Sequence, residues 1–281
     1  MHKVIPSLAA LAWLGVAGAA GARPCLYSAP RNVDLDATTL KSLLLNLGAA
    51  DAHIQAVPGL SQIQVRGTAC ASNPEWLDDL RIDTSRSGAQ ATVSARRRNH
   101  ESSFSLLGVS RYAYLKLSVS VPQQLAVAIN SGSGDVVAET LRSLDFHSGS
   151  GDLKADRIDG ALALDLGSGD VEARDVGNVE LRSTGSGDVT VSNVRGDVRA
   201  GQSGSGDLRF SDVRGSVSLG SIGSGDLRLE NIGGNVQVDS IGSGDMVVDV
   251  VTGNLQVGST GSGDVSYHGI KGTVHVGRRN D

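Results

Sequence analysis

The sequence predicts an all-β protein, a single-stranded parallel β-solenoid of about eight to nine coils preceded by an N-terminal β-rich cap. Three observations carry this prediction. The tetrapeptide Gly-Ser-Gly-Asp occurs eight times in the 281 residues, its aspartates lie 17 to 19 residues apart, and an alternating apolar pattern follows each of them. A constant period of this kind indicates one structural unit stacked on copies of itself. A β-sandwich would tolerate unequal hairpins, and a propeller blade needs about 40 residues.

Residues 1–22 have the composition of a secretory signal peptide. Lys3 is followed by the mostly apolar run 8–18, and the small residues 20–22 precede the expected cleavage site. The apolar run is too short to cross a bilayer as a helix, which needs about 20 residues. We therefore expect an exported chain, periplasmic, cell-surface or secreted, with no transmembrane segment in its mature part.

Cys25 and Cys70 are the two cysteines of the chain. Exported proteins fold in oxidising compartments, where an intramolecular disulfide is the economical explanation for such a pair. Neither cysteine has a histidine partner at ligand spacing, so a metal site is the poorer explanation. The sequence predicts a Cys25–Cys70 disulfide.

Residues 23–130 are predicted to form a β-rich capping region that contains a degenerate first coil. Gly48-Ala49-Ala50-Asp51 stands there in place of Gly-Ser-Gly-Asp, so stacking is expected to start near residue 40. The chain then leaves the period. A short helical turn is expected at 73–77, and strands are expected at 80–84, 91–97, 112–121 and 125–129. Because a bare terminal coil exposes its core and its strand edges, a covering region is expected at this end.

The basic run Arg96-Arg97-Arg98 and the nearby His100 lie beside a predicted loop at 99–103. Such a cluster can attract an anionic surface or a lipid headgroup. A solvated hairpin tip explains the same residues more simply.

Residues 131–281 are predicted to form eight coils of two short strands each. The positions one and three residues after each aspartate are apolar and the residue between them varies, which is typical of a strand with one buried face. A third apolar column follows six residues after the aspartate, and a second alternating strand comes next. The coils are expected to stack at roughly 4.8 Å. Those that start at Asp135 and Asp170 are each expected to lose one residue at a turn.

The repeated motif is itself a candidate site. Its glycines suit a sharp turn, through positive φ or close backbone approach, and its aspartates are expected to accept backbone N–H bonds across the turn. Stacked carboxylates repel one another, so a cation ladder that binds Ca²⁺ through aspartate and carbonyl oxygens stays open as an alternative; no other cofactor is predicted. The eight aspartates are Asp135, Asp152, Asp170, Asp188, Asp207, Asp226, Asp245 and Asp264.

The composition argues against other classes of function. Aromatic residues make up 3% of the chain and the formal net charge is −5, so no nucleic-acid partner is expected. Polysaccharide-cleaving β-helices place an irregular cluster of acids in a groove, whereas the acids here form a uniform column. His147, His268 and His275 interrupt the regularity, and each is better explained as a surface or end-coil residue. No catalytic residue is predicted.

The repeated Gly-Ser-Gly-Asp followed by Val-x-Val, together with the expected export and the pair Cys25 and Cys70, resembles a bacterial family of candidate adhesins of unknown function. The resemblance runs from about Leu40 to Val276. It implies a β-solenoid of the cell envelope with an adhesive role. The copy at residues 48–51 departs from the pattern because it lacks the serine.

The sequence therefore predicts a non-catalytic exported adhesion or binding module whose partner is an envelope protein or a glycan. The alternative is a structural envelope protein that self-associates through an exposed terminal coil, because the chain ends in Gly277-Arg278-Arg279-Asn280-Asp281 without an obvious capping helix. A carbohydrate-active enzyme is the third hypothesis.

Overall fold

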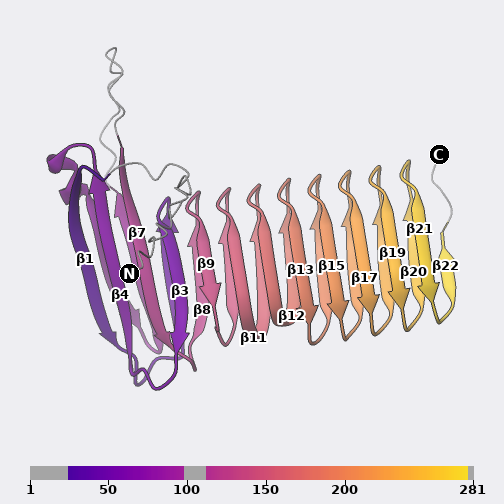
Figure 1. The fold of residues 1–281 in the computed structure, drawn as a ribbon, viewed down its shortest axis with the longest axis horizontal. Helices are drawn as coiled ribbons and strands as arrows, with labels where there is room; N and C mark the ends of the chain where they lie inside the picture. Colours follow the sequence, from indigo (N-terminus) through magenta and orange to yellow (C-terminus); the bar gives the residue numbers. More distant parts are fainter. Residues whose placement is uncertain (1–24, 98–111, 278–281) are drawn as a thin grey trace, which may run out of the picture.

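The computed structural model describes residues 25–97 and 112–277, which wind into a long solenoid of two facing sheets (Figure 1). Each regular coil contributes one strand to each sheet, and equivalent strands of successive coils pair in parallel. β11 (Leu153–Leu166) and β12 (Val171–Thr184) continue around a turn and so belong to both sheets. The predicted parallel β-solenoid is confirmed.

We call the two facing sheets the first sheet and the second sheet. The first sheet has the order β1–β4–β7–β3–β9–β11–β12–β13–β15–β17–β19–β21. The second has the order β5–β6–β2–β8–β10–β11–β12–β14–β16–β18–β20–β22. The remaining solenoid strands of the first sheet are β9 (Val136–Glu139), β13 (Val189–Val194), β15 (Leu208–Val213), β17 (Leu227–Ile232), β19 (Met246–Val251) and β21 (Val265–Ile270). Those of the second are β8 (Ala126–Ser131), β10 (Leu144–Ser148), β14 (Val198–Ser203), β16 (Val217–Ile222), β18 (Val236–Ile241), β20 (Leu255–Thr260) and β22 (Val274–Val276).

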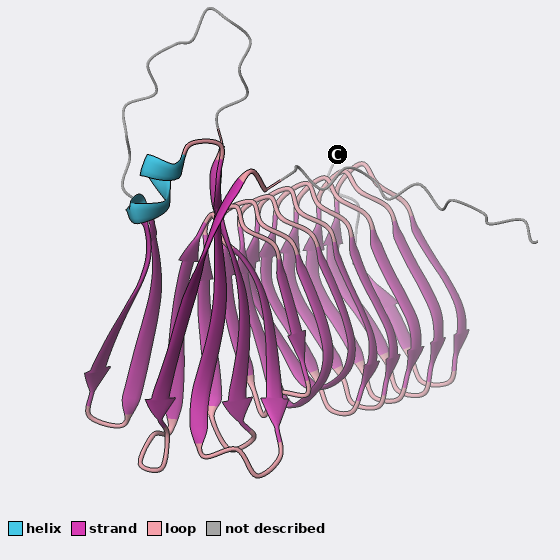
Figure 2. Cartoon of the chain, turned by 60° about the vertical axis from the view of Figure 1, so that its left-hand side comes forward, coloured by secondary structure: helices cyan, strands magenta, loops and turns pink. Residues whose placement is uncertain are grey.

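The N-terminal end is closed by strands that leave the period (Figure 2). The degenerate copy forms a first coil, in which β2 (Ser42–Gly48) and β3 (Asp51–Val57) pair with β8 and β9. Beyond it, β7 (Ala113–Pro122) pairs in parallel with β3, and β4 (Gln62–Ala71) and β1 (Tyr27–Asp36) follow as antiparallel strands. The hairpin of β5 (Leu80–Ser87) and β6 (Gln90–Arg97) extends the second sheet.

Three connections hold this cap together. The 3-10 helix η1 (Pro74–Asp79) joins β4 to β5, where the sequence predicts a short helical turn. The Arg31 guanidinium on β1 donates to the carbonyls of Leu77 and Leu80, at 2.6 Å each, and so ties the edge strand of the first sheet to the beginning of β5. Cys25 and Cys70 form the predicted disulfide, which fixes the segment before β1 to β4.

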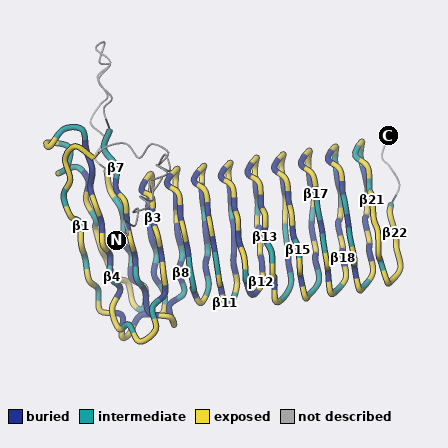
Figure 3. Tube along the Cα trace, in the orientation of Figure 1, coloured by how far each residue is buried: buried dark blue, intermediate teal, exposed yellow. Residues whose placement is uncertain are grey.

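The core runs between the two sheets along the whole stack, and inward and outward residues alternate along each strand (Figure 3). The three apolar columns after the aspartates are buried from the first Gly-Ser-Gly-Asp coil to the seventh; Val136, Ala138 and Leu141 are the members in the first. The inward residues of the second strands pack against them, with Phe146 wholly buried. Neither strand buries its apolar face without the other, which explains why the coil forms as a unit.

Two local features explain the unequal spacing of the aspartates. The coils that start at Asp135 and Asp170 have a turn one residue shorter between the two inner apolar columns, as predicted. From Arg182 onward the second strand also carries one extra residue, a β-bulge that the sequence analysis missed. The 19-residue coils have the longer turn and the bulge, and the 17-residue coil has neither. The bulge column is Arg182, Gly201, Gly220, Asp239 and Gly258.

Candidate functional site

The aspartates of the repeated motif form one continuous ladder along a corner of the solenoid. Oδ1 of each aspartate accepts a hydrogen bond from the backbone N–H of the aspartate in the next coil, at 2.8–3.3 Å, from Asp51 to Asp264. The bond therefore runs between coils and not across the turn, which corrects the sequence prediction. The N–H donors offset the repulsion between stacked carboxylates.

The glycines of the motif are required by close stacking. A Cβ at the second glycine of each copy would lie 1.9–2.2 Å from the carbonyl oxygen of the residue one coil earlier, as at Gly244 against Gly225. None of these glycines has a positive φ. Of the two reasons that the sequence leaves open, close backbone approach is the one that applies.

A second ladder occupies the opposite corner, and the sequence analysis missed it. It begins one residue before the second strand of the coil, where Asn178 Oδ1 accepts the N–H of Asp197 at 2.9 Å, and it ends at Thr273. The sequence signal for this ladder is the small polar residue that follows each turn glycine. The type of this residue varies from coil to coil, which hides the pattern. The members are Asn178, Asp197, Ser216, Asn235, Asn254 and Thr273. From the coil of Asp170 onward, each coil is thus two half-coils of one design: a glycine, a polar acceptor, then an apolar residue at the start of the strand.

The hydrogen bonds of the aspartate ladder use carboxylate oxygens that the calcium hypothesis requires as ligands. In each carboxylate from Asp51 to Asp245, one oxygen is already bound to the N–H of the next rung. Within residues 25–97 and 112–277, no group of three or more histidine, cysteine, aspartate or glutamate side chains is placed to hold a metal ion. Calcium binding by the aspartate and turn carbonyl oxygens stays a prediction.

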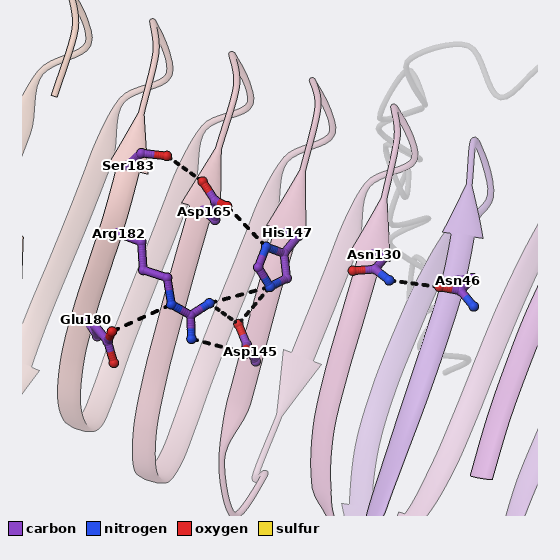
Figure 4. A network of polar contacts seen from close by, with 8 residues as sticks. All are labelled: Asn46, Asn130, Asp145, His147, Asp165, Glu180, Arg182 and Ser183. Carbon is purple, nitrogen blue, oxygen red and sulfur yellow. Dashed lines mark hydrogen bonds and ion pairs between the residues drawn. The ribbon is translucent and has the colours of Figure 1, made fainter. Parts of the chain in front are cut away.

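His147 belongs to a charged network on the outer face of the second sheet (Figure 4). Its Nε2 lies 3.2 Å from Oδ1 of Asp145, and its Nδ1 lies 3.3 Å from Oδ2 of Asp165. The bulge residue Arg182 reaches across β11 to both carboxylate oxygens of Asp145, at 2.8 and 3.2 Å. This pairing raises the pKa of Arg182. The hydroxyl of Ser183, and then His147, lower the pKa of Asp165.

The other predicted residues lie apart from this network. His268 and His275 are exposed on the last coil. His53, which the sequence analysis did not single out, pairs with Glu139 at 3.1 Å. Arg96 pairs with Asp83 at 2.7 Å.

A cleft borders the basic run at the N-terminal end of the solenoid. Its volume is about 870 Å³, and its lining includes the buried Leu47, Leu80 and Leu115 together with Arg96 and Arg97. Arg98 and His100 lie outside the described residues.

The outer faces of the two sheets differ in charge in the C-terminal half. On the first sheet, the outward residues of β15, β17 and β19 include Arg209, Arg228, Glu230 and Asp249, and Arg228 pairs with both acids. On the second sheet, the outward residues of β16, β18 and β20 form what we call the neutral face. They are Ser218, Gly220, Ser221, Gln237, Asp239, Ser240, Gln256, Gly258 and Ser259. Only one of the nine is charged, so this flat area offers hydroxyl and amide groups to a partner.

Comparison with known proteins identifies relatives by family and by fold. The family model described as Toastrack DUF4097 matches residues 45–208 and 156–276. No curated protein sequence matches the chain.

Three solved structures are similar to this chain at low sequence identity. A candidate cell adhesion protein from Clostridium sporogenes ATCC 15579 is 13% identical, with a TM-score of 0.30 over 90% of this chain and 100% of the other. A candidate adhesin from Bacteroides fragilis NCTC 9343 is 16% identical, with a TM-score of 0.37 over 93% and 100%. A candidate lipid-binding protein from Parabacteroides distasonis ATCC 8503 is 16% identical, with a TM-score of 0.42 over 89% and 96%.

Proposed function

The chain belongs to the Toastrack DUF4097 family, and we propose that it is a non-catalytic binding or adhesion module of the cell envelope. The neutral face on the second sheet is the surface that contacts the partner, an envelope protein or a glycan. The observation that carries the proposal is the contrast between the outer faces, paired charges on the first sheet and hydroxyl and amide groups on the second.

Physical chemistry favours the neutral face as a contact surface. Uncharged hydroxyls and amides lose their water at a smaller cost than charged groups, and they can donate to or accept from a partner. The sheet beneath them is held by backbone pairing on both sides, so little conformational entropy is lost on binding. Ser240 and Ser221 are already joined across coils by a 3.0 Å hydrogen bond, which orders part of the face.

Export is part of the proposal. The Cys25–Cys70 disulfide supports it, because disulfides persist in oxidising compartments. Within the described residues, no helix has the length and apolarity needed to cross a membrane. A fusion of residues 1–22 to a reporter that is active only after export tests the signal peptide, and a reporter retained in the cytoplasm would contradict it.

A matched pair of variants tests the binding surface. Ser240→Arg places a long charged side chain in the neutral face, and Ser211→Arg places the same side chain on the outer face of the first sheet; both serines are half-buried. Binding to envelope extracts and glycan arrays is measured for each. We expect Ser240→Arg to weaken binding at least about tenfold, the effect of losing about 1.4 kcal/mol, and Ser211→Arg to leave it unchanged. Equal binding by both variants would place the contact elsewhere.

A further inference from the structure

The last coil exposes side chains whose counterparts one coil earlier are buried (Figure 3). Tyr267 is 51% exposed, Val274 38% and Val276 36%. Their counterparts one coil earlier, Val248, Leu255 and Val257, are at most 1% exposed. The C-terminal end of the described solenoid is therefore an open cross-section through the core.

The edge strands at the two ends of the molecule differ in their protection against pairing with a strand of another chain. At the N-terminal end, β1 contains Pro30, which has no N–H, and it carries charged residues, as does β5. At the C-terminal end, β21 and β22 contain no proline and no Lys, Arg, Asp or Glu. Proline and charge are the usual protection of an edge strand against another chain. The C-terminal edges lack both, so they are open to pairing.

The C-terminal coil of a second copy of the chain fits this end. A two-fold axis perpendicular to the sheets places β21 beside β21 of the second copy, six residues against six, and β22 beside β22. Strands related in this way are antiparallel, which gives well-aligned hydrogen bonds, and both sheets and the core continue across the contact.

The charges beside β21 are complementary under the same rotation. Asp264 immediately precedes the strand and Lys271 immediately follows it. Among the described residues, no hydrogen bond reaches the Asp264 carboxylate, the last rung of its ladder, and no ion pair reaches Lys271. Antiparallel pairing brings each Asp264 beside Lys271 of the second copy, twice in the dimer.

We propose that the C-terminal coil is a self-complementary interface through which two copies of this chain pair tail to tail. The cap protects the other end, so the assembly closes as a dimer and does not grow into a fibre. A strand of six residues is only about 20 Å long, so the contact is small and we expect a weak, concentration-dependent dimer. This dimer does not depend on the neutral face or on its partner.

Charge reversal tests the interface. Sedimentation velocity of the full chain across a concentration series measures the dissociation constant of the dimer, and circular dichroism checks the fold. Asp264→Lys and Lys271→Asp each place like charges together, so we expect each to weaken the dimer at least tenfold. The double variant restores opposite pairing and recovers the original constant. Arg209→Asp, on the outer face of β15, is the control with no expected change.

Several outcomes would overturn the proposal. They are a chain that stays monomeric at the highest concentration, an open-ended series of larger species, or single reversals that leave the dimer intact. A spin label at Ser266→Cys, beside the interface, and one at Thr84→Cys, on β5, report the orientation. Tail-to-tail pairing gives a short label-to-label distance at 266 and none at 84, and the reverse result would also overturn it.

Discussion

One backbone position in each of the eight Gly-Ser-Gly-Asp coils is left-handed, five residues after the ladder aspartate. Asparagine and aspartate tolerate this conformation best after glycine. The Asn193 and Asn231 amides there donate to Asp175 and Asp212, one coil earlier, at 3.0 Å each. Thr140 and Val250 are the two β-branched members, and a β-branched side chain suits this region poorly. The described non-glycine members are Thr140, Arg157, Asp175, Asn193, Asp212, Asn231 and Val250, with φ of 54–59°.

Replacement of Val250 by asparagine is expected to stabilise the protein. The valine is 43% exposed, so little apolar burial is lost, and an asparagine relieves backbone strain of about 1 kcal/mol. The thermal midpoint of Val250→Asn is compared with that of Val247→Asn, which lies in the same strand without a positive φ. A midpoint for Val250→Asn at or below that of the parent protein would contradict the strain argument.

The Asp165 carboxyl gives a pH-dependent prediction. Its pKa in the folded protein is lowered, chiefly by the Ser183 hydroxyl. The charged form therefore stabilises the fold at pH values above the unfolded carboxyl pKa, and this contribution is lost as the pH falls through the folded pKa. In Ser183→Ala we expect the Asp165 titration, followed by carboxyl NMR, to move to higher pH. Ser218→Ala, on the neutral face, is the control, and an unmoved Asp165 titration in Ser183→Ala would contradict the assignment.

The ladders are the elements that hold successive corners in register. Each side chain of a ladder needs an acceptor oxygen and not a negative charge. On the second ladder, the uncharged Asn178, Asn235 and Asn254 accept the same kind of backbone N–H bond. The aspartate column therefore works as a structural element in which every side chain binds the coil that follows.

Two substitutions at Asp207 separate the acceptor from the charge. Asp207→Ala leaves the N–H of Asp226 without its partner and is expected to cost about 1–2 kcal/mol in the free energy of unfolding. Asp207→Asn keeps an oxygen at that place and removes like-charge repulsion, so we expect stability equal to the parent or higher at low salt. Both are measured by urea denaturation. An Asp207→Asn loss as large as that of Asp207→Ala would show that the charge itself matters.

The calcium hypothesis has its own measurement. If the ladder binds Ca²⁺, excess chelator lowers the thermal midpoint of the parent protein and added Ca²⁺ restores it. A midpoint that does not respond to either addition would remove the hypothesis.

At the scale of the whole molecule, the stability of each coil depends on the coils that are stacked against it. Each coil packs mainly against its two neighbours, so an end coil has one main stabilising interface where an inner coil has two. The cap provides a second interface for the first coil, through β6 and β7. The last coil has none among the described residues, which makes it the least stable part of the stack.

Hydrogen exchange measures this gradient. The backbone amides of β21 and β22 are expected to exchange faster than those of β13 and β15, and those of β2 and β3 at the capped end are expected to stay protected. The comparison is made at low protein concentration, where the tail-to-tail dimer is dissociated. Equal protection along the stack would contradict the open end.

The sequence by itself determined the coil: its period, its two strands, its inward columns and its shortened turns at Asp135 and Asp170. These features depend on alternation within about 20 residues, and the apolar residues report it directly. The Cys25–Cys70 pairing was also predictable, because the chain has only two cysteines.

Only the tertiary structure decided which residues of different coils contact one another. Asp152 meets the N–H of a residue 18 positions later, and Arg182 reaches Asp145 from 37 positions away. The bulge at Arg182, the second ladder from Asn178 and the reason for the motif glycines all depend on how one coil rests on the next. These contacts join residues of different coils, so the pattern of residues within one coil does not show them.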